Sequence, residues 1–349
     1  MRQFLPAILG LALLWPLAAL PVEAWAQQDP TERAKVAETR ASAEDDRATF
    51  TLQYENDLLA GTDQQYTNGF RAAYLSSTGG APEWLRSVRP WLTPLLDAEG
   101  AMRVGFAFGQ NLYTPNDTDR RTLDRRDRPY AAWTYATISL VTDTGSRLDT
   151  VALDIGVVGP AALGEQVQNN VHRLMGVDKS NGWDNQIDNE PGVNLIWQRK
   201  WRIAPRPLFD DFGFDVTPMV GASLGNVFTH ASAGAAFRFG QDLKADYGPP
   251  RIRPSVAGSD FYRTNSGWGW YLFAGFEGRA VARDITLDGN SFRDSHSVDK
   301  EILVGDAQFG FAILYEAVRL AFTYDMRTKE FDGQRENVRF GAISLSTRF

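Results

Sequence analysis

The stretch VRLAFTYDMR, residues 318–327, decides the class of fold because its apolar and charged side chains alternate. The apolar side chains occupy every second position: Val318, Leu320, Phe322, Tyr324 and Met326. The positions between them include Arg319, Thr323, Asp325 and Arg327. Side chains two residues apart lie on the same face of a β-strand, so this strand has one apolar and one charged face. Residues 150–157 and 269–281 divide in the same way.

Such alternation is typical of a transmembrane barrel, whose apolar side chains face lipid and whose polar side chains face the interior. A soluble β-sandwich is the alternative, because it buries its apolar face and periodicity alone does not separate the two. Beyond the N-terminus, no stretch reaches the ~20 apolar residues of a transmembrane helix. Trp and Tyr lie near strand ends, and residues 338–349 alternate and end on Phe349, like the insertion signal of bacterial outer-membrane proteins. These features favour the barrel.

About twelve segments have strand character, and bacterial barrels have an even number of strands. They are residues 49–56, 66–76, 102–110, 131–142, 150–157, 192–202, 213–224, 229–239, 269–281, 304–316, 318–327 and 337–348. We therefore predict an all-β fold, a transmembrane antiparallel β-barrel of about 12 strands with short helical segments in loops. With both ends in the periplasm, most long polar connections face outward. Residues 77–101, with a short helix expected around 84–96, and residues 240–268 do not fit this rule, and the pattern gives no account of the latter.

The N-terminus has the pattern of a secretory signal peptide. Residues 1–26 place one Arg ahead of an apolar core and end on a small-x-small cleavage site. A retained membrane anchor is the alternative, but two prolines interrupt the apolar run. Residues 27–47 are polar and without periodicity, so we expect a flexible periplasmic tail. The barrel domain is then residues 48–349.

The composition excludes several classes of function. The chain has no cysteine, so neither a disulfide framework nor a thiol nucleophile is available. Its formal net charge of −7 argues against nucleic-acid binding, which needs a basic surface. It has three histidines and no HExxH motif, so a zinc site is not expected.

His172 is the strongest candidate for a general base. It lies in residues 164–176, where the apolar residues have helical spacing and Gly176 is a plausible helix stop. A packed or surface histidine is the alternative. Ser223 is a second candidate, because the string GASLG around it matches the GxSxG motif of hydrolases. No helix is expected after it, so the nucleophile-elbow geometry is missing.

Polar clusters in three outward connections are expected to meet His172 at one rim of the barrel. The first contains Glu55, Asn56 and Asp57, with Asp63 and the string YTNG at 66–69. Carboxylate, amide and hydroxyl oxygens together suit a hard cation such as calcium. An ordinary polar hairpin turn is the alternative, since these residue types are common in turns.

The second cluster spans residues 111–130, where Arg120 or Arg121 can hold a phosphate or an oxyanion through paired N–H groups. A solvated loop of mixed charge is the alternative. The third joins Asp178 and Lys179 to the acidic stretch that ends at Glu190. Its carboxylates can join a cation or orient His172. Within this stretch, Trp183 can equally be an interfacial anchor.

Several strings together resemble one known family. They are YENDLLAGTDQQYTNG (54–69), GQNLYTP (109–115), DRPYAAW (127–133), GVVGPAALGEQVQNNVH (156–172) and GWDNQIDNEPG (182–192), and the similarity extends to GNVFTHASAGAAFRFG (225–240). In this order they closely resemble the outer-membrane lipid A 3′-O-deacylase family. The resemblance implies a twelve-stranded barrel in the outer membrane with its active site at the outer leaflet. It also implies calcium-dependent hydrolysis of an ester-linked 3′-acyloxyacyl chain of lipid A, by a water molecule that a histidine activates.

The resemblance also implies roles for single residues. His172 would be the general base, and Asn56, Asp57 and Thr67 match essential polar positions near the base and the cation. Arg120 matches a basic position, usually Lys, that helps to hold the substrate or the oxyanion. Asp178 stands where the family has Glu, so its shorter side chain can weaken or rearrange the cation site.

The expected site is therefore as follows. Calcium would be bound by Asp57, Asn56 and Asp178. The substrate, lipid A or lipopolysaccharide, would contact Arg120, Arg121 and Lys179, and the protein would be a monomer among outer-membrane lipids. The alternatives are a barrel without enzymatic activity, either a pore or an envelope-structural protein, and a barrel phospholipase with Ser223 as nucleophile.

Strand parity raises one difficulty for this site. If Phe50, Leu52 and Tyr54 face lipid, Asp57 turns inward and Asn56 turns outward. A bulge or the end of the strand at Asn56 would resolve this.

Overall fold

The computed structural model describes residues 47–61, 65–78, 80–97, 100–209, 211–252, 258–263 and 267–349. The expected signal peptide, the expected tail apart from Arg47, and Asp63 lie outside these ranges, so the first two remain predictions. In the described part of the chain, no helix is both long enough and apolar enough to cross a bilayer.

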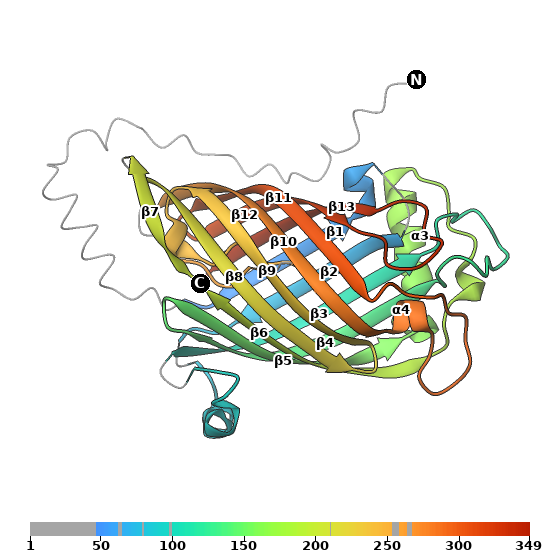
Figure 1. Ribbon diagram of the computed structural model, residues 1–349, viewed down its shortest axis with the longest axis horizontal. Coiled ribbons are helices and arrows are strands. Elements are labelled where there is room, and N and C mark those ends of the chain that lie inside the picture. Colours follow the sequence, from blue (N-terminus) through green and yellow to red (C-terminus); the bar gives the residue numbers. More distant parts are fainter. Residues whose placement is uncertain are drawn as a thin grey trace, which may run out of the picture.

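Twelve of the strands form a closed antiparallel ring (Figure 1). The strands are β1 (Thr49–Asn56), β2 (Gln65–Leu75), β3 (Ala101–Thr114), β4 (Ala131–Asp143), β5 (Arg147–Val158), β6 (Glu190–Trp201), β7 (Ile203–Phe209), β8 (Phe212–Gly225), β9 (Phe228–Gly240), β10 (Trp268–Asp284), β11 (Leu303–Tyr315), β12 (Val318–Arg327) and β13 (Val338–Arg348). Pairing of β1 with β13 and of β6 with β8 closes the ring. The predicted barrel and all twelve predicted strands are confirmed.

The sequence did not predict β7. This strand continues the line of β6 beyond Arg202 and pairs with the first residues of β8. It contains Pro207, which has no backbone N–H and is tolerated mainly in edge strands. The proline is compatible with this position because β7 lies beyond the ring, at an edge of the sheet.

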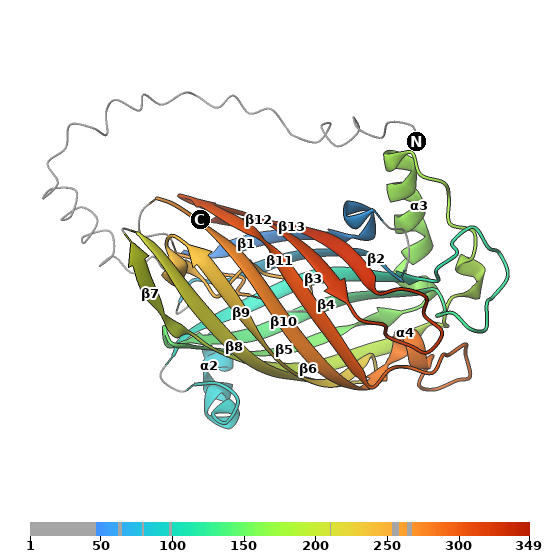
Figure 2. The same cartoon turned by 45° about the horizontal axis from the view of Figure 1, so that its top comes forward.

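Short helices lie in the connections, as expected. They are η3 (Asp57–Ala60), α2 (Glu83–Val88), η4 (Arg89–Leu92), η5 (Pro160–Ala162), α3 (Gly164–Met175), η6 (Trp183–Asn185), η7 (Leu243–Ala245) and α4 (Ile285–Asp288). Both strand termini, Thr49 and Arg348, lie at one end of the barrel, which we call the terminal rim. The opposite end carries η3, α3 and α4, and we call it the loop rim (Figures 1 and 2).

The two faces of β12 show which side of the sheet is polar. Val318, Leu320 and Met326 are 41%, 42% and 40% exposed, whereas Arg319 and Asp325 are fully buried. A soluble sandwich would bury its apolar face, so the outward apolar wall excludes that alternative.

Part of the β9–β10 connection fills the lumen, and this accounts for the long segment that the sequence left unexplained. We call its described residues, 241–252 and 258–263, the plug. Arg251 donates to Glu55 of β1 at 2.8 Å and to Asp325 of β12 at 3.1 Å. Asp260 accepts from Arg71 of β2 at 2.9 Å. These three strands lie on one side of the ring, and from the other side Lys200 of β6 donates to the Gly258 backbone oxygen, so the plug crosses the lumen.

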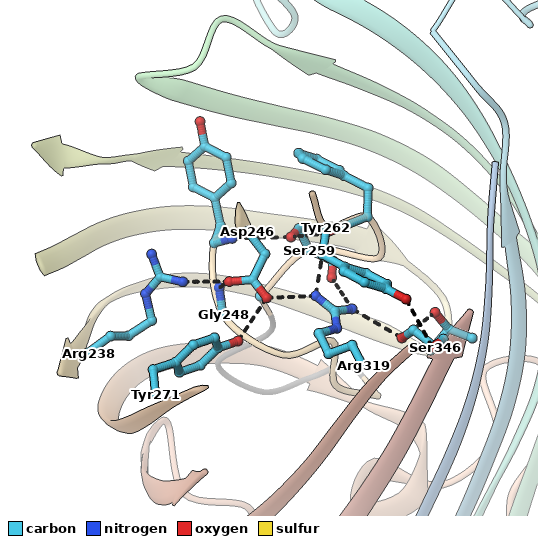
Figure 3. A network of polar contacts seen from close by, with 12 residues as sticks. Arg238, Asp246, Gly248, Ser259, Tyr262, Tyr271, Arg319 and Ser346 are labelled. Carbon is cyan, nitrogen blue, oxygen red and sulfur yellow. Dashed lines mark hydrogen bonds and ion pairs between the residues drawn. The ribbon is translucent and has the colours of Figure 1, made fainter. Parts of the chain in front are cut away.

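The Asp246 carboxylate of the plug accepts hydrogen bonds from four groups (Figure 3). Arg238 of β9 and Arg319 of β12 point at it from two sides, at 2.5 and 2.8 Å. The Tyr271 hydroxyl and the Gly248 amide donate at 2.8 and 3.0 Å. A buried charge is tolerated when it is paired and hydrogen-bonded, and these four donors meet that condition.

Replacing Asp246 with Ala should strongly destabilise the barrel, because it leaves Arg319 buried without its carboxylate. Breaking a buried ion pair by removing one partner costs about 3–5 kcal/mol. Urea unfolding in lipid vesicles should show a free energy of unfolding lower by that amount. Asp124→Ala is the control, since it breaks a largely exposed pair with Arg120 and should cost at most about 1 kcal/mol. Equal losses in the two variants would contradict this role of Asp246.

Candidate active site

Two glycines fix α3 at the loop rim. A Cβ atom at Gly164 would lie 2.5 Å from the Trp183 ring and 2.6 Å from the Ala132 Cβ, so only glycine fits there. At the other end, Gly176 adopts a left-handed conformation with φ of 70° and caps the helix. The predicted helix stop is confirmed, and α3 is held against the base of its loop.

His172 lies on α3 and is almost fully buried. Its Nδ1 lies 2.6 Å from the backbone oxygen of Asp178, and its Nε2 lies 3.5 Å from the Nε2 of Gln168. Beside it runs a groove lined by α3 and by Val177 and Lys179. The imidazole is thus held in one orientation next to an opening at the loop rim.

The contacts of Gln168 define the tautomer of His172. The Trp183 indole N–H donates to the Oε1 of Gln168 at 2.7 Å, and an indole N–H can only donate. The NH₂ group of Gln168 therefore faces Nε2 of His172, which must present its lone pair. The proton is then on Nδ1, which donates to Asp178. This is the neutral tautomer with a basic Nε2.

The sequence leaves the role of Trp183 open: it is either part of the polar cluster or an interfacial anchor. The structure buries it against Tyr130 and bonds it to Gln168, so it is not an interfacial anchor. Gln168 stands one helical turn before His172, a spacing visible in the sequence. The contact with Trp183 depends on how residues 176–183 fold back, and no sequence pattern shows that.

Asn56, Asp57 and Thr67 lie at the ends of β1 and β2 on the loop rim. The strand ends at Asn56, whose side-chain oxygen accepts from the Leu58 amide at 2.9 Å and caps η3. Its side-chain amide donates to the Thr67 backbone oxygen at 2.9 Å. Asn56 and Asp57 are therefore both buried, and the parity difficulty is resolved by the end of the strand.

The basic candidates lie on exposed loop surface. Arg120 bonds to Asp124 at 2.9 Å and to Thr122 at 3.2 Å within its own loop. Lys179 lies 3.9 Å from Glu165, and Arg121 is exposed. The Asp178 side chain is also exposed, while its carbonyl holds His172.

The loops that carry these residues contact one another. Asn181 donates to the Thr118 backbone oxygen at 2.9 Å, and Asn185 donates to that of Arg121 at 2.8 Å. At the base of the same loop, the hydroxyls of Thr114 and Thr67 are 2.6 Å apart. The structure thus gathers the Asn56, Arg120 and His172 clusters at one rim, where both views place α3 beside the blue turn after β1 (Figures 1 and 2).

Ser223 lies elsewhere. It faces the lumen on β8 and donates its hydroxyl proton to the Phe228 backbone oxygen at 3.0 Å. The chain continues from β8 into β9 without a helix. The nucleophile elbow is therefore missing, as the sequence suggested.

The structure places oxygen donors at the positions expected for calcium. Asp57 supplies a buried carboxylate and Asn56 a buried amide oxygen, both hard oxygen donors of the kind that calcium prefers. Across the described ranges, three or more His, Asp or Glu side chains nowhere gather closely enough to hold a metal by themselves. The donor chemistry fits calcium, and amide or backbone oxygens would have to complete the site.

Comparison with known proteins decides the family. The family model described as outer membrane protein LpxR matches residues 11–349. The chain belongs to the LpxR family. This is the outer-membrane lipid A 3′-O-deacylase family that the motifs indicated, so the chain is a hydrolase of that class and the alternative of a barrel without enzymatic activity is wrong.

One solved structure supports the same fold, and two others match with lower structural similarity. LpxR from Salmonella typhimurium is 22% identical, with a TM-score of 0.69 over 86% of this chain and 100% of that one. The β domain of the Bordetella autotransporter BrkA has a TM-score of 0.39 at 10% identity, covering 86% of this chain and 98% of that one. The translocator domain of NalP from Neisseria meningitidis has a TM-score of 0.36 at 10% identity, covering 91% of this chain and 94% of that one. A search of curated proteins found no match.

Membership of the LpxR family confirms the predicted location in the outer membrane. In such barrels the longer loops face outward and the short turns face the periplasm. The terminal rim therefore faces the periplasm, and the loop rim, which carries α3, faces outward.

Replacing Trp183 with Phe should weaken the selection of the His172 tautomer, because Gln168 loses the donor that orients its amide. The ¹⁵N spectrum of histidine-labelled wild-type protein should show His172 protonated on Nδ1. In the variant this signal should shift toward a mixture of tautomers, with hydrolysis slowed about fivefold, the value of one hydrogen bond. An unchanged spectrum would contradict the Trp183–Gln168–His172 relay.

Proposed function

We propose that this chain hydrolyses the ester-linked 3′-acyloxyacyl chain of lipid A with a water molecule that His172 deprotonates. The observation that carries the proposal is the fixed neutral tautomer of His172 beside a groove at the loop rim. A general base needs a lone pair with a defined direction, and Nε2 has one; its contact with the Gln168 amide is long, at 3.5 Å, and the attacking water would displace that amide.

The proton and the bonds can be followed through the reaction. Nε2 of His172 takes a proton from water, and the hydroxide oxygen adds to the ester carbonyl carbon. The Asp178 carbonyl, which accepts from Nδ1 at 2.6 Å, stabilises the imidazolium that forms. The tetrahedral species then breaks its bond to the sugar oxygen, and the imidazolium returns its proton to that oxygen. No covalent acyl-enzyme is needed.

Arg120 would stabilise the oxyanion or hold the substrate. In the structure its guanidinium binds Asp124, and the two side chains are 46% and 31% exposed. An exposed pair of this kind contributes at most about 1 kcal/mol, so a substrate anion can displace Asp124 at little cost. Arg121 and Lys179 present further positive charge on the same exposed rim, suited to the phosphates of lipid A.

Calcium would be held by Asp57, Asn56 and Asp178 with further oxygen donors. When bound, the ion supplies positive charge that polarises the ester carbonyl. Asp57 is the strongest of these candidates because its carboxylate is buried at the rim.

The location presents the substrate to the site. The loop rim meets the outer leaflet, where lipopolysaccharide resides, and the apolar outer wall below it suits acyl chains. A single ring carries all of the proposed residues, so the enzyme would act as a monomer.

Replacing His172 with Ala should lower the rate of hydrolysis by about a hundredfold to ten-thousandfold, the usual contribution of a general base. The assay incubates protein in detergent with lipid A and calcium and follows loss of the acyloxyacyl mass by mass spectrometry. Ser223→Ala is the matched control and should keep wild-type activity. Loss of activity in the Ser223 variant alone would overturn the proposal in favour of a serine phospholipase.

Removing calcium with a chelator should abolish hydrolysis, and adding calcium back should restore it. Calorimetric titration should show Asp57→Asn weakening calcium binding about tenfold or more, because a charged ligand is lost. Asp124→Asn, on the exposed Arg120 loop, should leave binding unchanged. Full activity in chelator, or equal calcium binding by the Asp57 variant, would contradict the proposed cation site.

A further inference from the structure

The β2–β3 connection forms a structure of its own at the terminal rim. It contains α2 and η4, and we call residues 81–97 the arm. Figures 1 and 2 show α2 outside the ring, on the side of β5 and β6. Neither family membership nor the catalytic proposal assigns a role to the arm.

One side of the arm packs on the outside of the barrel. Leu85 and Leu96 form a cluster with Met102 and Val104 of β3. Between the latter two, Arg103 points into the lumen, where it donates to Ser76 and covers the Phe261 ring of the plug. Since neighbouring residues of a strand face opposite sides, Met102 and Val104 point outward, and the arm lies on the outer wall.

The end of the arm covers charged groups on that wall. Asp149 of β5 and Arg199 of β6 form an ion pair at 2.6 Å, and the Asp149 carboxylate also accepts from the Asp97 amide at 2.9 Å. The Leu95 carbonyl accepts from the Trp197 indole at 2.9 Å. Val193 and Leu195, on the same face of β6 as Trp197, are exposed to the bilayer side. The arm therefore covers a charged patch that would otherwise border lipid.

The other side of the arm is apolar and uncovered. Trp84 and Trp91 are 62% and 85% exposed, which is unusual for side chains this large. Their level in the membrane follows from β3. Along its outward row, Met102 and Val104 lie under the arm, and Phe106 and Phe108 follow as exposed lipid-facing side chains. The arm therefore lies on the terminal-rim side of the exposed lipid-facing wall, directly next to it.

From this continuity we propose that the arm is an interfacial anchor whose partner is the phospholipid headgroup layer at the terminal rim. Trp84 and Trp91 insert into that layer, while Leu85 and Leu96 hold the arm on the barrel. Trp is enriched at membrane interfaces because its ring is apolar and its N–H is polar. The anchor fixes the depth of the barrel in the bilayer and keeps lipid away from the Asp149–Arg199 pair.

The absence of cysteine makes a direct test simple. Single cysteines replace Trp84 or Trp91, each with the other Trp retained, and carry an environment-sensitive fluorophore. The protein is reconstituted in vesicles of phosphatidylcholine and phosphatidylglycerol that contain lipids with a quencher near the headgroup or near the end of the acyl chain. Phe106→Cys is the control on the lipid-facing wall, and Ser146→Cys is the control in an exposed turn of the same rim.

Labels at Trp84 and Trp91 should be quenched most by the shallow quencher, that at Phe106 more by the deep one, and that at Ser146 by neither. Heat-dependent gel migration checks that each variant is folded. The wild-type chain and a Trp84→Phe/Trp91→Phe double variant provide an unlabelled comparison, in which brominated lipids should quench a smaller share of the double variant's fluorescence. Absence of quenching at both arm positions, with normal quenching at Phe106, would overturn the proposal. If the labels at Trp84 and Trp91 are shielded from water only at high protein density, the surface contacts a second copy of the chain, and this result would also overturn the proposal.

Discussion

The closure of the ring through β6 and β8 is the constraint on which the rest of the structure depends. Hydrocarbon offers no water to unpaired backbone N–H and C=O groups, so a sheet in the membrane must have no free edge. Once closed, the sheet has an apolar wall outside and a polar lumen inside. Charges such as Arg319 and Asp325 then need partners within the lumen, and the plug supplies several of them.

Closure also determines where chemistry can occur. Antiparallel strands return every second connection to the same rim, and this brings Asn56, Arg120 and His172 to one end although they are far apart in the chain. Hydrogen bonds then hold the rim together: the hydroxyls of Thr67 and Thr114 join β2 to β3, and Asn185 donates to the backbone oxygen of Arg121 in the neighbouring loop. The rigid barrel provides a fixed base for these loops, which contain little regular secondary structure.

The sequence allowed the barrel to be predicted nearly in full, because alternation in stretches such as residues 318–327 depends only on which side each residue faces. It missed β7, where Pro207 argues against a strand. It gave no account of the plug, because an irregular segment has no period and its partners, such as Glu55 for Arg251, are remote in the chain. For the candidate site, it pointed to His172, Asn56 and Asp57, which the structure places at one rim, but not to the contact of Trp183 with Gln168 that selects the tautomer. Packing between loops depends on three-dimensional approach, which spacing along the chain does not record.

The position of Asp246 between Arg238 and Arg319 also has a mechanical consequence. The two arginines belong to strands on different parts of the circumference, and one carboxylate holds both. If the lateral pressure of the bilayer flattened the barrel, the Asp246 carboxylate would be pulled away from the two guanidinium groups, in a lumen with little water to screen the charges. The plug thus acts as an internal brace that resists changes in cross-section, and the loops at the far rim are mounted on a stiff support.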